Sequence, residues 1–297
     1  MLREGKLQFT LSALFLILLL SLPAAGQGEP GDTEPTEPLP EPADLSVPND
    51  LVREQKYEEA ERALAALQQD HPDDPRLLLM RGEVLLAIGR AEQALELLQQ
   101  TAAVDPERPR LHFQLGTARA ATGDRAGALQ AFARELELND DVQVKGMVHL
   151  NRSLLFQQDG KWDDAVSELE RVLELEPERV QIFGDLASLQ LQAGKADAAA
   201  ETLERARAAG FESSPHQYSL GARLYRDGRY EPAVEAFRKA LEIEPTMASA
   251  ERSLAAALEK LGRDDEAIQH LRRYLELVPD AWDADTVRKQ LEANEGR

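Results

Sequence analysis

The sequence of 297 residues contains no cysteine. This absence excludes disulfide bonds, thiol catalysis, thiolate metal sites and a lipid-anchored N-terminal cysteine. Aromatic residues are also scarce, at 5% of the chain, whereas alanine and leucine are abundant. Such a composition is typical of stacked helices, whose core needs no covalent cross-links.

Basic residues are in short supply too. The chain has 34 lysines and arginines against 54 aspartates and glutamates, giving a formal net charge of −20. A protein that binds nucleic acid needs the opposite balance. No phosphate-binding loop, H-E-x-x-H, G-x-S-x-G or calcium-loop motif is present. The sequence therefore predicts a protein that is not an enzyme, carries no cofactor and binds no nucleic acid.

One spacing dominates what is present. Alanine recurs at intervals of 34, 34, 37, 34, 34 and 34 residues, namely at Ala60, Ala94, Ala128, Ala165, Ala199, Ala233 and Ala267. Leucine or phenylalanine follows each alanine four residues later, at Leu64, Leu98, Phe132, Leu169, Leu203, Phe237 and Leu271. Six of the alanines follow a glycine by five residues, at Gly89, Gly123, Gly160, Gly194, Gly228 and Gly262. A period of this length indicates a repeated supersecondary unit.

The clearest unit runs from Ser214 to Met247. Leu220 and Leu224 are four residues apart and share one helix face. Gly228 suits the left-handed residue that ends this first helix, and Pro245 ends the second helix because proline cannot continue it. With the Gly, Leu, Tyr, Ala, Phe and Pro positions of this stretch, the unit resembles the tetratricopeptide repeat, a helix–turn–helix of 34 residues.

The resemblance implies an all-α fold. We expect a right-handed α-solenoid of about seven units over residues 51–281, then a C-terminal capping helix and tail over 282–297. The first helix of the first unit would contain Pro48 and span only a turn or two. Three extra residues precede the fourth unit, so we expect the second helix of the third unit to run on, or the loop Asn139–Lys145 to bulge. That insertion is either a hinge or simply tolerated.

The N-terminus has a different composition. Residues 1–26 have a basic head, an apolar middle and a small-residue exit, which predicts a secretory signal peptide, with an uncleaved anchor formed by residues 7–22 as the alternative. Residues 27–50 carry seven acidic residues, repeated proline and no basic residue, which predicts a disordered acidic linker.

Two sets of polar residues invite a chemical interpretation. His112 and His149 fall at the same position of neighbouring units, but two imidazoles without a third ligand make a poor metal site, so we expect them to be partly buried and neutral. The pairs Asp163–Asp164 and Asp264–Asp265 follow turn glycines. There they begin a second helix, where carboxylates favour the helix dipole, and this role is preferred over catalysis.

By the same resemblance, the first helices of the units line a concave groove. The groove residues that we expect to bind a partner are Arg76, Leu79, Met80, Arg110, Phe113, Gln114, Asn151, Leu154, Gln157, Tyr218, Tyr225 and Arg226. Aromatic and methionine side chains among amides suit an extended peptide or a helix, although some of these residues are expected only to pack between units.

The sequence thus predicts a non-enzymatic protein-binding scaffold of the cell envelope that holds a segment of another protein, an extended peptide or a helix, in its groove. A self-assembling structural protein is the alternative. The expected location is exported, either periplasmic or secreted, or anchored to the membrane by residues 7–22. The identity of the partner and the oligomeric state stay open.

Overall fold

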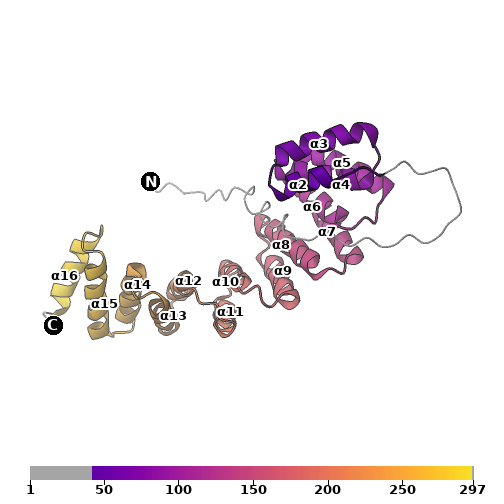
Figure 1. Ribbon diagram of the computed structural model, residues 1–297. Coiled ribbons are helices and arrows are strands. Elements are labelled where there is room, and N and C mark those ends of the chain that lie inside the picture. Colours follow the sequence, from indigo (N-terminus) through magenta and orange to yellow (C-terminus); the bar gives the residue numbers. More distant parts are fainter. Residues whose placement is uncertain (1–41, 296–297) are drawn as a thin grey trace. The chain divides into compact units, whose positions relative to one another are not determined.

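The computed structural model describes residues 42–295, which fold into fifteen helices and no strand (Figure 1). The all-α prediction is therefore confirmed. The helices are α2 Ser46–Arg53, α3 Tyr57–Asp70, α4 Pro75–Ala87, α5 Ala91–Val104, α6 Leu111–Ala121, α7 Arg125–Leu138, α8 Val142–Gln158, α9 Trp162–Leu175, α10 Ile182–Gln192, α11 Ala196–Ala208, α12 Ser214–Arg226, α13 Tyr230–Ile243, α14 Ala248–Lys260, α15 Asp264–Leu277 and α16 Ala284–Glu295. None of these described helices has the length and apolarity needed to span a bilayer. The predicted signal peptide, and the predicted linker as far as residue 41, lie outside the described residues.

The helices form hairpins with the predicted spacing. In the hairpin α12–α13, Gly228 has φ +74°, a left-handed conformation that glycine adopts without steric cost and that turns the chain from one helix into the next. A Cβ added to Gly221 would come within 2.6 Å of the Phe237 ring, so glycine is what lets the two helices approach. Ala233 is fully buried between them.

The chain divides into two compact units, one ending at Leu155 and one beginning at Phe156. In unit 1, three apolar clusters follow one another along the hairpins, from Leu64 and Leu77 through Leu98 to Phe132. In unit 2, one continuous cluster reaches from Ala187 in α10 to Leu291 in α16. Each hairpin therefore buries its apolar faces mainly against its neighbours, as expected for a solenoid.

Within each unit, the first helices of successive hairpins are direct neighbours. Close backbone contact links α4 with α6 in unit 1, and α10 with α12 and α12 with α14 in unit 2. Among the described helices, no two second helices of successive hairpins approach each other to the same extent. We call the side formed by the first helices the inner side, and the side formed by the second helices the outer side.

The N-terminal boundary of the repeats differs from the prediction. Helix α2 has eight residues and contains the buried Pro48, which confirms a short first helix. It begins at Ser46, inside the range 27–50 predicted to be disordered linker. That boundary is wrong because Ala43 and Pro48 are buried; Ala43 belongs to the cluster of Ala60 and Leu64, and its backbone N–H also donates to Asp74 Oδ2 at 3.1 Å.

The three inserted residues also behave differently from the prediction. Helix α7 ends at Leu138 and no bulged loop follows; instead α8 starts early and has 17 residues. The Asp141 carboxylate accepts hydrogen bonds from the backbone N–H groups of Gln143 and Val144, at 2.8 and 3.1 Å, which begins the added turn. Val144 is buried against Phe132 and Met147. The division between the units lies further on, within α8.

The C-terminal helix α16 covers the last hairpin. Val287 and Leu291 are buried in the cluster of Leu271 and Tyr274. The predicted cap starts at residue 282, but the helix begins two residues later, and Trp282 is 96% exposed.

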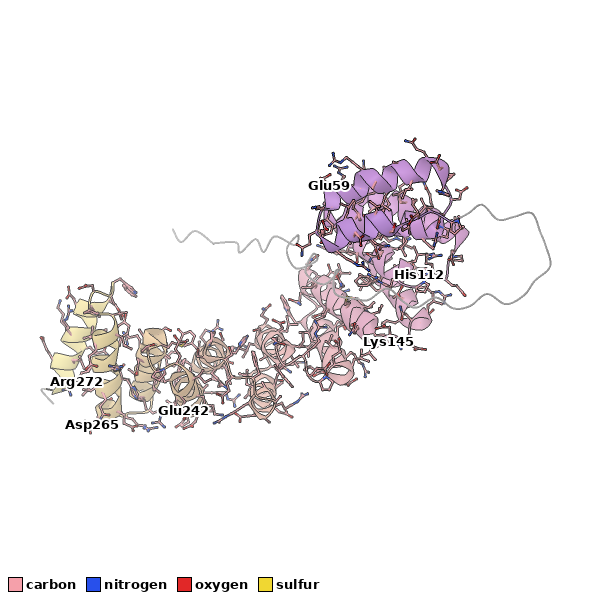
Figure 2. All side chains as sticks on the ribbon, viewed as in Figure 1. Glu59, His112, Lys145, Glu242, Asp265 and Arg272 are labelled. Atoms are coloured by element: carbon pink, nitrogen blue, oxygen red, sulfur yellow. The ribbon has the colours of Figure 1, made fainter. Side chains whose placement is uncertain are left out.

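Exposed acidic side chains lie on second helices, including Glu59 on α3, Glu242 on α13 and Asp265 on α15 (Figure 2).

Candidate functional site

The residues predicted to bind a partner lie on first helices, except Arg110, which immediately precedes α6, but their exposure differs. Arg76 and Arg226 are exposed; Leu79, Met80, Arg110, Leu154, Gln157, Tyr218 and Tyr225 are half-buried; Phe113, Gln114 and Asn151 are buried. The prediction that these last three face a partner is wrong, since a buried side chain offers no surface to a ligand.

Phe113 belongs to the core of unit 1. Its side chain is 3% exposed and its ring centroid lies 6.0 Å from that of Phe132. Its backbone N–H donates to Glu135 Oε2 at 3.0 Å. Glu135, on α7, thus serves as a cap for the N-terminus of α6, where Arg110 has φ +70° and its side chain does not cap the helix.

Gln114 and Arg110 use their polar groups inside unit 1. Gln114 Nε2 donates to Glu83 Oε1 at 2.9 Å, and Arg110 Nη2 lies 3.3 Å from the same oxygen. Burial raises the pKa of Glu83, while the Arg110 charge and the Gln114 hydrogen bond oppose the rise. These contacts join α4 to α6, so the polar groups that the sequence assigns to a partner hold two first helices together.

Asn151 and Arg76 are also engaged. Asn151 Nδ2 donates to the Met147 carbonyl oxygen, one turn back in α8, at 2.8 Å. Arg76 Nη2 lies 2.8 Å from Asp74 Oδ2 and donates to the Ala43 carbonyl oxygen at 3.1 Å. Arg76 therefore ties the segment before α2 to the start of α4.

The inner side of α12 in unit 2 is different. The Tyr218 ring packs against Phe237 with centroids 5.7 Å apart, and Tyr225 packs edge-on against Tyr230 at 5.4 Å. Both tyrosines stay half-buried, so helix α13 fixes their rings while part of each ring faces solvent. The neighbouring Arg226 is exposed, and its side chain makes no ion pair or hydrogen bond within residues 42–295. This is the one place where the predicted set combines fixed aromatic rings with an unengaged cation.

Several charged groups on α12 and on the helices beside it are either affected by burial or already paired with other side chains. Burial raises the pKa of Asp185 on α10, and burial lowers the pKa of His216 on α12, although each group's charge opposes the other's shift. On α14, Arg252 Nε donates to Asp283 Oδ2 at 3.2 Å, and the Tyr274 hydroxyl donates to Asp283 Oδ1 at 2.6 Å. Arg252 therefore fastens the start of α16.

The histidine and carboxylate side chains of the described residues are the candidates for a metal site. No group of three or more histidine, aspartate or glutamate side chains among them is placed to hold an ion. His112 Nε2 lies 2.8 Å from the Pro106 carbonyl oxygen, and His270 Nδ1 lies 2.6 Å from Glu251 Oε2, so both imidazoles have structural partners.

A feature that sequence reasoning missed lies on the outer side of unit 2. A cavity of about 490 Å³ opens between α11 and α13, with Leu220, Leu224 and Gln217 of α12 among its lining residues. Ala200 and Ala236 line it as well. Two small residues at facing positions of neighbouring repeats, Ala200 and Ala236, are the sequence signal for this cavity.

The successive helical hairpins place this protein in the class of helical-repeat proteins, whose surfaces are formed by stacked hairpins. The family model of the tetratricopeptide repeat matches residues 51–113, 156–224 and 224–291, and the chain belongs to this family. Members of the family are generally non-catalytic scaffolds for protein–protein interaction. The unmatched stretch between residues 113 and 156 contains the insertion and the long helix α8.

Two solved structures with TM-scores above 0.5 have a similar fold. The C-terminal part of a TPR repeat-containing protein from Cytophaga hutchinsonii is 14% identical, with a TM-score of 0.67, over 82% of this chain and 99% of that one. A chain in the structure of Naa15/Naa10 bound to HypK-THB is 18% identical, with a TM-score of 0.58, over 84% of this chain and 38% of that one. The MamA protein is 24% identical over 58% of this chain and 92% of that one, with a TM-score of 0.46. No curated protein matches the chain in sequence.

Proposed function

We propose that this protein is a non-enzymatic scaffold of the cell envelope that holds a segment of another protein, an extended peptide or a helix, against the inner side of unit 2. The observation that carries the proposal is the surface of α12, where Tyr218 and Tyr225 are fixed by Phe237 and Tyr230 next to the unengaged Arg226.

The chemistry of this surface suits a protein partner. Tyrosine and arginine dominate binding energy at protein interfaces, and rings already fixed in the free protein lose little conformational entropy on binding. Arg226 can donate to a carboxylate, so we expect a partner segment with an apolar residue beside an acidic one. The net charge of −20 disfavours nucleic acid as the partner.

A photo-crosslinking residue at position 225, in cells with an intact envelope, tests the binding surface. The matched control carries the same residue at position 265, which is exposed on α15. We expect one dominant protein to be captured from position 225 and not from position 265. Equal capture from both positions would exclude the inner side of α12 as a specific site.

The envelope location rests on residues 1–26 and is tested separately. Cell fractionation should place the protein outside the cytoplasm, and the mass of the purified protein should show a new N-terminus at Gln27. An intact N-terminus in the membrane fraction would favour anchoring by residues 7–22, and an intact protein in the cytoplasm would exclude an envelope role.

One observation favours the alternative of self-assembly. Trp282 is 96% exposed between α15 and α16, and an indole ring in water favours association with another apolar surface. Light scattering over a range of concentrations tests this alternative, with Trp282→Ser as the variant. A size that rises with concentration and falls back in the variant would support self-assembly, and a monomer throughout would exclude it.

A further inference from the structure

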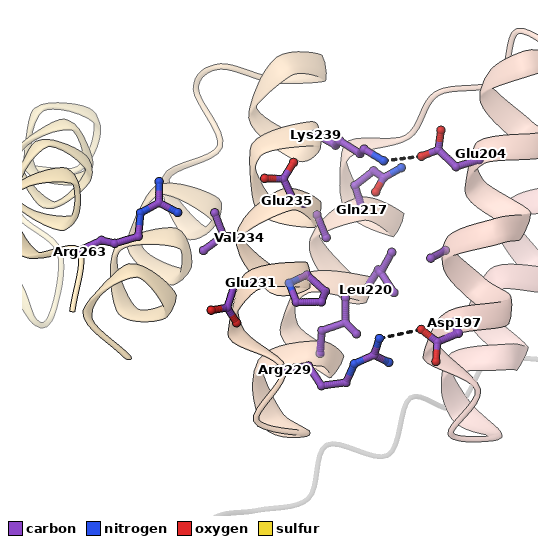
Figure 3. A pocket seen from close by; sticks show the side chains of 14 residues that line it. Asp197, Glu204, Gln217, Leu220, Arg229, Glu231, Val234, Glu235, Lys239 and Arg263 are labelled. Carbon is purple, nitrogen blue, oxygen red and sulfur yellow. Dashed lines mark hydrogen bonds and ion pairs between the residues drawn. The ribbon is translucent and has the colours of Figure 1, made fainter. Parts of the chain in front are cut away.

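The cavity on the outer side of unit 2 is a cleft between two parallel second helices. Ala200 of α11 and Ala236 of α13 line it, and Leu220 and Leu224 of α12 make it apolar. Figure 3 shows Leu220 and Gln217 among the side chains that line it. A smaller cavity of about 160 Å³ shares Gln217 and Lys239 with it and continues toward Phe211. We call the two cavities together the α11–α13 cleft.

The cleft lies at a junction where both facing side chains are small. At the position of Ala200, the other six repeats carry Glu61, Leu95, Leu129, Val166, Val234 and Ile268. At the position of Ala236, facing it from the next repeat, the other repeats carry Ala63, Leu97, Ala131, Glu168, Thr202 and His270; Ala63 lies in the first repeat and has no preceding repeat to face. Only the junction of α11 and α13 has alanine on both sides. The two small side chains leave space open between these second helices.

A buried amide faces this space without a partner. Gln217 is 7% exposed, and its Oε1 accepts no hydrogen bond within the described residues. In the next hairpin, the equivalent residue is Glu251, whose Oε2 lies 2.6 Å from His270 Nδ1. The residue equivalent to His270 is Ala236, which offers no polar group. An unpaired buried acceptor is unfavourable, so Gln217 gains from a ligand that donates to it.

Ion pairs bound the cleft at two points. Arg229 Nη2 donates to Asp197 Oδ1 at 2.8 Å, and Lys239 donates to Glu204, so both pairs join α13 to α11 (Figure 3). The first pair recurs at other junctions, as Lys195 with Asp163 and Arg90 with Glu58, and is a general feature of this stack. Acidic residues outnumber basic ones in the lining of the larger cavity, since Glu231 and Glu235 join Asp197 and Glu204 against Arg229, Lys239 and Arg263.

We infer that the α11–α13 cleft is a second binding site, which takes a short extended peptide segment of a partner protein. One aliphatic side chain of the peptide fills the space left by Ala200 and Ala236. One backbone amide of the peptide pairs with the Gln217 carboxamide, which has both a donor and an acceptor. The interior of a helix does not fit, because its backbone N–H and C=O groups are already bonded to each other. The acidic surplus of the lining favours lysine or arginine beside the aliphatic residue.

The test uses the full chain and a defined probe, the blocked peptide Ac-Lys-Ala-Leu-Ala-Lys-NH2, which is too short to form a stable helix. In a titration of the ¹⁵N-labelled protein, the Gln217 side-chain amide signals and the backbone signals of Ala200 and Ala236 should shift together and saturate. The same peptide with aspartate in place of leucine should bind at least about tenfold more weakly, since a charge cannot enter the apolar space without loss of hydration.

Two substitutions separate a specific site from a surface effect. Ala200→Leu fills the cleft with the residue found at the same position in Leu95 and Leu129, and should weaken peptide binding by at least about tenfold. Ala208→Leu, at an exposed site on the same helix, makes the same chemical change and should leave binding unaltered. If Ala200→Leu disturbs folding, Ala200→Val, which copies Val166 and Val234, repeats the test with less added volume.

The outcomes also separate this site from the proposed function. Tyr225→Ala should leave peptide binding in the cleft intact even where it abolishes capture of the partner on the inner side. Shifts confined to Tyr225 and Arg226, or wild-type affinity in Ala200→Leu, would overturn the cleft as a peptide site. Concentration-dependent broadening of Ala200 and Ala236 without peptide would overturn it in favour of a second copy of the chain.

Discussion

Two hairpins of this protein, α6–α7 in unit 1 and α12–α13 in unit 2, contain the same arrangement of three interior residues: a glycine, a phenylalanine and a second aromatic residue. A glycine on the first helix, Gly116 or Gly221, lies so close to a phenylalanine on the second that an added Cβ would come within 2.5 or 2.6 Å of its ring. An aromatic residue, Phe113 or Tyr218, packs against that phenylalanine at 6.0 or 5.7 Å. Yet Phe113 is 3% exposed, and Tyr218 is half-buried.

The difference comes from the helix that follows. In unit 1, the insertion adds a turn at the start of α8, and Val144 and Met147 join Phe113 in one buried cluster. In unit 2, α14 begins at Ala248 without such a turn, and Tyr218 stays half-buried, with its hydroxyl oxygen 3.5 Å from Ser253 Oγ. The exposure of a residue in a repeat is therefore set by the neighbouring repeat as well as by its own position.

The largest expected effect comes from disrupting the close helix packing that each of the two hairpins contains. Ala233 is fully buried between α12 and α13, so Ala233→Arg forces a charge between close-packed helices. We expect it to reduce the free energy of unfolding of unit 2 by more than about 4 kcal/mol, as measured by urea denaturation. Glu242→Arg, at an exposed site on the same helix, is the control and should have little effect. A native-like transition in Ala233→Arg would contradict the close packing of this hairpin.

The second prediction compares the two aromatic residues directly. Phe113→Ala should lower the free energy of unfolding by about 3–5 kcal/mol, because it leaves a cavity in the core of unit 1. Tyr218→Ala should lower it by less than about 2 kcal/mol, since part of the ring already faces solvent. Urea denaturation of both variants measures the difference. Equal losses would mean that α8 does not give Phe113 its added burial.

The contrast between these two residues also shows what the sequence can predict. Periodic alanine, glycine and phenylalanine predict the hairpins, the turn glycines and the close approach at Gly221, because these depend on contacts inside one 34-residue unit. The burial of Phe113 depends on an added turn in α8, which begins because Asp141 caps it. That contact lies outside the repeat pattern, so the pattern alone predicts Phe113 and Tyr218 to be alike.

The binding residues show the same limit. The engagement of Arg110 and Gln114 with Glu83 arises between two repeats, and a position within one repeat carries no information about it. The α11–α13 cleft also depends on two repeats, since either alanine alone is ordinary. A comparison of facing positions across junctions would have identified Ala200 and Ala236 from the sequence.

The third prediction compares the N-terminus of α4 in unit 1 with the N-terminus of α12 in unit 2. Asp74 caps α4 through the Arg76 backbone N–H at 2.9 Å, whereas the Ser213 side chain does not cap α12. Burial acts to raise the pKa of Asp74, but the side-chain and backbone hydrogen bonds from Arg76 and the N–H of Ala43 outweigh it and lower the pKa to about 2. Asp74→Ala should therefore destabilise unit 1 by about 1 kcal/mol at pH 7.

The sign of the pH dependence follows from that pKa. Because the folded pKa of Asp74 lies below its ordinary value of 3.8, its charge stabilises the fold above that value. This contribution is lost as the pH falls from 3.8 to about 2. Urea denaturation of the wild type and Asp74→Ala at several pH values should show the gap narrowing over this range. A gap that stays constant would mean that packing, and not the carboxylate, supports α4. Ser213→Ala should show no such pH dependence.

The smallest expected effect on stability is that of Arg226→Ala on α12, which is compared with Arg110→Ala at the start of α6. Arg226→Ala should change the free energy of unfolding by less than about 0.5 kcal/mol, since Arg226 is exposed and unengaged in the described structure, while it should reduce the crosslinking yield from position 225. Arg110→Ala should lower stability by about 1 kcal/mol, because Glu83 loses its cation, and leave that yield unchanged. Urea denaturation and crosslinking of both variants test the pair. If Arg226→Ala lost as much stability as Arg110→Ala, the α12 side chains would be engaged internally as those of α6 are, and a partner would have no unengaged cation to bind.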